Sequence, residues 1–173
     1  MTVTEASSGQ PALPPQVVPL AAAQPTEIEL DGLPVGVYDV EVTADRPVVA
    51  AVWQTTGFDE GADFAWYTPA PLVSAPSLFA TPAGPPPSLT IVNPGDAEAI
   101  VAVSSADGTF RLELTVAPAG STMVRLSPRT VYQLDPGGSS IRAGVSLAGD
   151  GALAGFPVWP ADAAAPQILV YPQ

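Results

Sequence analysis

The chain has 173 residues and a formal charge of −12 at neutral pH, with 22 prolines, 15 glycines, and neither cysteine nor histidine. Its only basic residues are five arginines, so no basic face is available to neutralise nucleic-acid phosphates or an anionic membrane surface. The missing residue types exclude disulfide bonds, thiolate nucleophiles, histidine bases, and serine nucleophiles that need a histidine or lysine partner. No segment reaches the ~20 apolar residues of a membrane-spanning helix, and the first residues lack the pattern of a signal peptide.

The first half of the chain predicts short strands. Its apolar residues are mainly alanine, valine and leucine, scattered among prolines and glycines that disfavour helices and favour tight turns. In chain order, the strand-like segments are residues 26–30 (TEIEL), 47–52 (PVVAAV), 64–70 (FAWYTPA) and 76–82 (PSLFATP). Residues 83–87 (AGPPP) favour an extended, semi-rigid spacer, so we place a proline-rich linker there.

The second half shows clearer strands, each bounded by a turn. Residues 110–116 alternate strictly between apolar and polar, which predicts one buried face made by Phe110, Leu112, Leu114 and Val116. The other strand-like segments are residues 89–92, 100–103, 123–126, 130–134, 141–147 and 168–171. Seven short strands at this spacing predict an antiparallel, immunoglobulin-like β-sandwich.

The two halves also match each other as an internal repeat. The matching segments are residues 26–30 with 122–126, 37–38 with 131–132, 47–52 with 140–145, 64–70 with 155–161, and 76–82 with 166–172. Val3 corresponds to Val103, but nothing in the first half corresponds to residues 88–96, the opening strand and turn of the second half. The fold class predicted is therefore all-β with two tandem sandwich modules, residues 1–82 and 88–173, the first lacking its opening strand.

The truncated first copy has two interpretations. The simpler one is that the chain is a fragment cut from a longer repeat protein. The alternative is that the first copy diverged and lost this strand.

The aromatic residues are the first group of candidate site residues. Aromatic faces offer large contact area for sugar rings, so Trp66, Tyr67 and Trp159 are candidates for stacking against a glycan. The competing interpretation is packing in a core or between modules, because Trp53 ends an apolar run and Trp66 and Trp159 occupy matching segments beside prolines. We favour packing, and the burial of the tryptophans decides between the two.

The second group is the acidic loop that contains Asp59, Glu60 and Asp63, an insertion that the second copy lacks. Its carboxylates are hard oxygen ligands and make it a weak calcium candidate, although the spacing matches no EF-hand. Two carboxylates about 5–10 Å apart also suffice for glycoside hydrolysis. The favoured interpretation is a solvated surface loop, so neither a catalytic residue nor a cofactor is predicted.

Several turn and strand sequences carry a family resemblance. They are residues 45–51 (DRPVVAA), 63–66 (DFAW), 88–96 (SLTIVNPGD) and 116–122 (VAPAGST). In these segments the chain resembles the DUF5719 proteins of actinobacteria, a family of unknown function. The resemblance implies β-sandwich repeats and an extracellular or cell-envelope location, with the export signal upstream of this fragment. It supplies no catalytic residues.

These features together predict a non-catalytic extracellular or cell-envelope module, with a structural role or a role in binding an envelope protein. The alternative is a carbohydrate-binding module that uses its surface aromatics to bind an envelope glycan. A hydrolase that uses carboxylates is the least favoured of the three. No nucleic-acid partner and no membrane span are expected.

Overall fold

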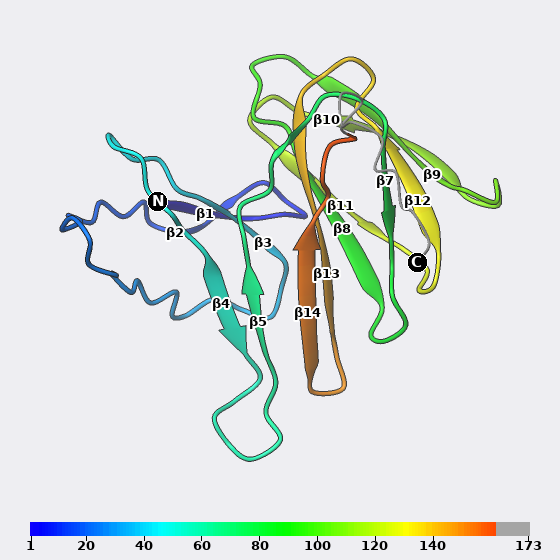
Figure 1. Ribbon diagram of the computed structural model, residues 1–173. Helices are drawn as coiled ribbons and strands as arrows, with labels where there is room; N and C mark the ends of the chain where they lie inside the picture. The colour runs from blue at the N-terminus through cyan, green and yellow to red at the C-terminus, as the bar shows by residue number, and fades with distance from the viewer. Residues whose placement is uncertain (162–173) are drawn as a thin grey trace, which may run out of the picture.

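The computed structural model describes residues 1–161, and every regular element in them is a β-strand (Figure 1). The all-β prediction is therefore confirmed for these residues, whereas the closing strand predicted at residues 168–171 lies outside them. The first seven strands are β1 (Thr2–Glu5), β2 (Pro11–Leu13), β3 (Tyr38–Glu41), β4 (Val52–Thr55), β5 (Phe64–Tyr67), β6 (Leu72–Val73) and β7 (Ser77–Ala80). The remaining seven are β8 (Pro87–Val92), β9 (Ala99–Ser105), β10 (Arg111–Val116), β11 (Ser121–Arg125), β12 (Val131–Asp135), β13 (Ile141–Gly149) and β14 (Ala152–Pro157). The described part of the chain contains no helix able to cross a membrane.

Two antiparallel sheets enclose the main apolar core. One sheet has the strand order β10-β9-β12-β7, and the other has the order β11-β8-β13-β14, with β6 also paired to β13. Buried residues alternate along β8 and β9, so each of these strands turns one face inward. Leu89 and Ile91 from one sheet meet Val101 and Val103 from the other in a single core, which makes this unit sandwich-like.

The alternation predicted over residues 110–116 is confirmed. Val116 is buried, and Phe110, Leu112 and Leu114 pack against the core. The intervening positions of β10 are exposed, as expected for a strand with one buried and one solvated face.

The predicted division of the chain at residues 83–87 needs correction. β7 precedes this linker but pairs with β12, and β6 pairs with β13. Phe79 of β7 stacks on Tyr132 of β12, with 5.6 Å between ring centroids, and Val73 of β6 is fully buried. Residues 72–80 therefore share sheets and core with residues 87–157, because strand pairing is not limited to neighbours along the chain.

A smaller sheet at the N-terminus repeats part of this pattern. Its order is β2-β1-β3, in which Val3 pairs with Leu13 on one side and Val40 on the other. In the larger sheet Val103 pairs in the same way with Leu112 and Leu134. The sheet β2-β1-β3 thus has the pairing of β10-β9-β12, and no strand within residues 1–161 takes the place of β7.

Two predicted strands of the first half do not form. Residues 26–30 and 48–51 are irregular, although the matching residues 122–125 belong to β11 and 141–144 to β13. Both β11 and β13 hydrogen-bond to β8, which lies between them. The first half has no sequence counterpart of β8, so its two segments lack the central strand whose N–H and C=O groups would hold them in a sheet.

Candidate binding surface

Strands β4 and β5 form a two-stranded antiparallel ribbon that presents aromatic side chains to solvent. Trp53 lies directly opposite Trp66, and the next pair on the same face is Thr55 with Phe64. The centroid of the Trp53 ring lies 6.5 Å from that of Trp66 and 6.0 Å from that of Phe58 in the following loop. Trp53 is 41% exposed and Trp66 60%. We call Trp53, Phe58, Phe64 and Trp66 the aromatic face.

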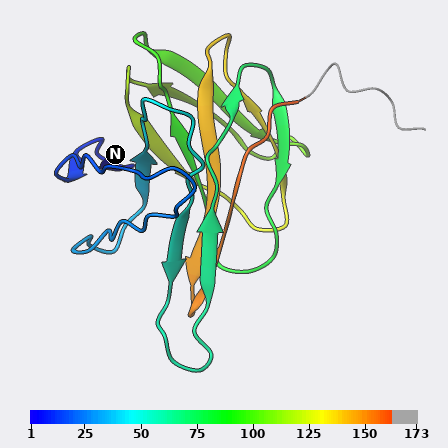
Figure 2. The ribbon, with the colours of Figure 1, turned by 60° about the vertical axis from the view of Figure 1, so that its left-hand side comes forward.

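The opposite side of this ribbon packs on the sandwich-like unit, beside β14 (Figures 1 and 2). The Tyr67 ring lies so close to Gly155 that a Cβ added at Gly155 would fall 2.2 Å from it. The Tyr67 hydroxyl donates a hydrogen bond to Gln54 Oε1 at 3.2 Å, and burial raises the pKa of the phenol. Tyr67 therefore anchors the ribbon, and it does not share an exposed face with Trp66.

Asp63 fixes the end of the same ribbon. Its Oδ2 accepts a hydrogen bond from the backbone N–H of Leu153 at 2.8 Å, and its Oδ1 accepts one from the N–H of Phe64 at 2.9 Å. The Leu153 bond and then the Phe64 bond lower the pKa of the carboxyl group. Asp59, Glu60 and Asp63 form no metal-binding cluster among the described residues, so the calcium prediction is not supported by their placement.

Asp63→Asn is expected to lower the melting temperature by a few degrees at pH 7, because an amide has a single acceptor oxygen and can accept only one of the two N–H groups, of Leu153 and Phe64, that the carboxylate accepts. The folded-state pKa of Asp63 lies below its ordinary value of 3.8. The stabilisation is therefore complete above about pH 5 and is lost as the pH falls through the folded-state pKa. Melting curves of wild type and variant should converge in acid, and Asp59→Asn in the same loop is the control. An equal difference at every pH would contradict this role.

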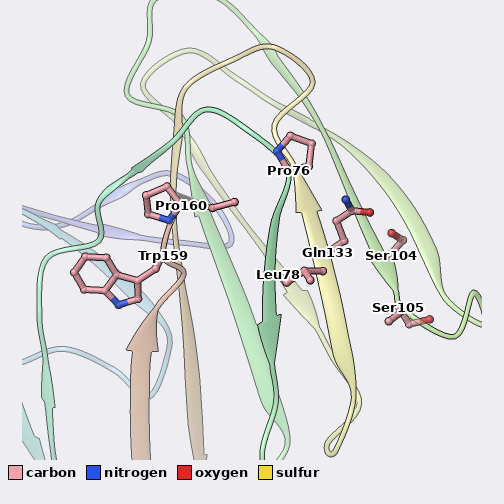
Figure 3. A pocket seen from close by; sticks show the side chains of 9 residues that line it. Pro76, Leu78, Ser104, Ser105, Gln133, Trp159 and Pro160 are labelled. Carbon is pink, nitrogen blue, oxygen red and sulfur yellow. The ribbon is translucent and has the colours of Figure 1, made fainter. Parts of the chain in front are cut away.

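Trp159 lies apart from the aromatic face, at the rim of an open pocket of about 680 Å³ (Figure 3). Leu78, Gln133 and Ser104, on β7, β12 and β9, line the floor of this pocket. Trp159 is 67% exposed. The pocket combines one exposed aromatic ring with amide and hydroxyl groups, whereas the aromatic face gathers four rings.

The prediction that Trp66 and Trp159 pack in a core is wrong. Both rings are exposed. Trp53 is exposed as well, because the apolar run before it forms no buried central strand. Sequence reasoning also missed Phe58, which lies in a loop where alternation gives no signal. Its closeness to Trp53 follows only from the turn between β4 and β5.

The chain is thus an all-β protein with a sandwich-like unit and an exposed aromatic ribbon. A family of unknown function, DUF5719, matches residues 5–128. The chain belongs to this family. No curated protein and no solved structure matches the chain.

Proposed function

We propose that this protein is a non-catalytic binding module that holds a polysaccharide on its aromatic face. The observation that carries the proposal is the exposure of four aromatic rings on one side of a short ribbon. Such contiguous apolar surface is uncommon on soluble proteins and usually marks an interaction site. The composition supports a non-catalytic role, since histidine, lysine and cysteine are all absent.

The chemistry of the face favours a neutral glycan. Aromatic rings stack against the apolar faces of sugars, and the tilts of 44° and 45° between neighbouring rings suit a twisted polymer better than a flat one. Asp59 and Glu60 follow Phe58 directly and offer acceptors for sugar hydroxyls. The net charge of −12 disfavours anionic polysaccharides.

The second candidate function is docking of an envelope protein. It is favoured by the contact between Tyr67 and Gly155, in which the β4–β5 ribbon covers the neighbouring hairpin β13–β14. One face of this hairpin is therefore already covered by another part of the same chain. The aromatic face would bind a partner in a comparable way through its large rings.

Replacing Trp53 and Trp66 together by alanine is expected to weaken binding to a neutral insoluble polysaccharide by about tenfold or more, since each stacked ring contributes ~1 kcal/mol. Depletion of the protein from solution by a panel of neutral and acidic polysaccharides measures the effect. Trp159→Ala, which removes an exposed ring outside the aromatic face, is the control. Trp159→Ala should change the stability little, and the melting temperature of the double variant is measured beside its binding because Trp53 packs against Trp66 and Phe58.

If the wild type binds none of the neutral polysaccharides, the glycan proposal fails and protein docking becomes the better candidate. If Trp159→Ala abolishes binding while the double variant retains it, the site is the pocket and not the aromatic face.

The wider setting is also part of the proposal. An extracellular or cell-envelope location, in an actinobacterium, would give such a module access to envelope glycans and proteins. The composition supports this origin, since alanine, proline, glycine and arginine without lysine are typical of a GC-rich coding sequence. The tandem immunoglobulin-like arrangement is proposed on the sequence repeat and on the matching pairing of β1 and β9.

A further inference from the structure

The pocket beside Trp159 is the feature that carries a further inference. None of the residues that line it is charged, although the chain as a whole has a charge of −12. Trp159, Pro160 and Pro76 give it an apolar side, and Gln133 and Ser104 bring an amide and a hydroxyl group (Figure 3). Its ligand is therefore expected to be neutral and to combine apolar surface with hydrogen-bonding groups.

Strand pairing places the floor of this pocket in one row across the sheet. Gln133 of β12 lies opposite Leu78 of β7 on one side and opposite Ser104 of β9 on the other. Neighbouring strands lie ~4.8 Å apart, so the row extends over about 10 Å from Leu78 to Ser104. A polyproline II chain rises ~3.1 Å per residue, so about three residues of such a chain span the row.

A proline-rich peptide has the chemistry that this pocket recognises. A polyproline II chain makes no internal hydrogen bonds, so its carbonyl oxygens can accept from the Gln133 NH₂ and the Ser104 hydroxyl. Its proline rings can pack on the Trp159 ring, as they do in other aromatic-lined grooves that bind such segments. A glycan fits less well, because the side chains of Pro76 and Pro160 offer no hydrogen-bonding group to sugar hydroxyls.

The chain carries such a segment on its surface, at residues 14–19 (PPQVVP), within a run without charged residues that extends over residues 10–26. The three prolines of the segment are exposed: Pro14, Pro15 and Pro19. Val17 is 99% exposed, whereas the N–H of Gln16 donates to Met1 O at 3.0 Å and holds the segment at one point. Because proline fixes its own φ and keeps the preceding residue extended, the segment favours polyproline II geometry.

We propose that the pocket beside Trp159 binds residues 14–19 of a second copy of this chain. This segment follows β2 on one side of the molecule and the pocket lies over β7 and β12 on the other, so the two do not meet within one copy (Figures 1 and 2). Copies that each carry a charge of −12 repel one another, which favours contact where both surfaces are uncharged. Each copy gives a segment and receives one, so the contact is heterologous and produces open chains of molecules.

Two substitutions test this proposal, one on each partner. Trp159→Ala removes the aromatic side of the pocket, and Pro15→Glu places a charge on the segment. Sedimentation equilibrium of the full chain, without polysaccharide, is expected to show a mass that rises with concentration for the wild type. Each variant alone is expected to need an about tenfold higher concentration or more to associate. An equimolar mixture keeps one intact segment and one intact pocket, so it is expected to form a dimer of one of each.

Two matched controls separate this contact from general effects of the substitutions. Ile100→Ala removes an exposed apolar side chain from the same sheet outside the pocket, and Gln24→Glu adds the same charge to the uncharged run outside the segment. Both should associate as the wild type does. A labelled peptide of residues 10–20, followed by fluorescence anisotropy, is expected to bind Trp159→Ala about tenfold or more weakly than the wild type.

A wild type that stays monomeric at all concentrations overturns the proposal, even if the peptide binds, since the pocket then takes a proline-rich segment of another protein. Association that Pro15→Glu leaves unchanged also overturns it, because a different part of the second copy then fills the pocket. Equal binding of the peptide to the wild type and Trp159→Ala has the same consequence. If Trp159→Ala does not fold, Gln133→Ala tests the same pocket from its floor.

Discussion

Phe79→Ala is expected to destabilise the protein by about 3–5 kcal/mol, the usual cost of removing a buried aromatic side chain. Phe79 is 8% exposed and stacks on Tyr132, which in turn meets Phe110 edge to face with 5.9 Å between ring centroids. The substitution removes one end of this row of three rings and opens a cavity beside Tyr132. Denaturant unfolding followed by circular dichroism measures the loss.

The control for this prediction is the neighbouring residue of the same strand. Leu78 points away from the core and is 67% exposed, so Leu78→Ala should change the stability by less than about 0.5 kcal/mol. Equal effects of the two substitutions would show that β7 does not belong to the sandwich-like unit. A large effect of Phe79→Ala alone supports placing residues 72–80 with the second half of the chain.

Asn93→Ala is expected to cost about 2–3 kcal/mol, because it leaves buried backbone groups without hydrogen-bond partners. Asn93 is buried, and its Nδ2 donates to the carbonyl oxygens of Ala97, Val116 and Ala117 at 2.8, 3.1 and 3.2 Å. Its Oδ1 accepts the N–H of Gly95 at 3.0 Å. One side chain thus connects the end of β8 to the end of β10 in the other sheet.

Asn93→Asp separates the donor role from the acceptor role. A carboxylate still accepts from Gly95, but it places a negative charge beside three carbonyl oxygens and donates to none. We expect this variant to be at least as unstable as Asn93→Ala at pH 7 and to recover stability as the pH falls, since burial and these carbonyls raise the pKa of an acid at this position. Asp96→Ala, in the same exposed turn, is the control. A pH-independent loss would contradict the donor role of Asn93.

The aromatic face has its cause in the missing counterpart of β8. In the second half, β8 holds β11 and β13 in one sheet. In the first half the corresponding residues stay irregular, and the ribbon β4–β5 remains a two-stranded element with one face in solvent. A surface that presents Trp53 and Trp66 is thus compatible with a stable fold because Tyr67 and Asp63 attach the other side to β14.

The sequence by itself determined the all-β class and the inward face of the strand at residues 110–116. Strict alternation at Phe110, Leu112 and Leu114 was sufficient, because side chains of a strand point to opposite faces with a period of two residues. The match of Val3 to Val103 likewise predicted corresponding positions. Val3 lies on β1, between β2 and β3, and Val103 lies on β9, between β10 and β12.

Only the tertiary structure decided which strands pair and which aromatic rings are buried. Phe79 and Trp66 both lie in short apolar segments near prolines, yet Phe79 is buried against β12 while Trp66 faces solvent. Local patterns cannot separate them, since burial depends on whether a second sheet covers the face. Strand pairing is equally non-local. The linker at residues 83–87 has the composition of a domain boundary, but β7, which precedes it, pairs with β12, which follows it. The reason is that β12 offers the backbone groups and the apolar contact that β7 needs.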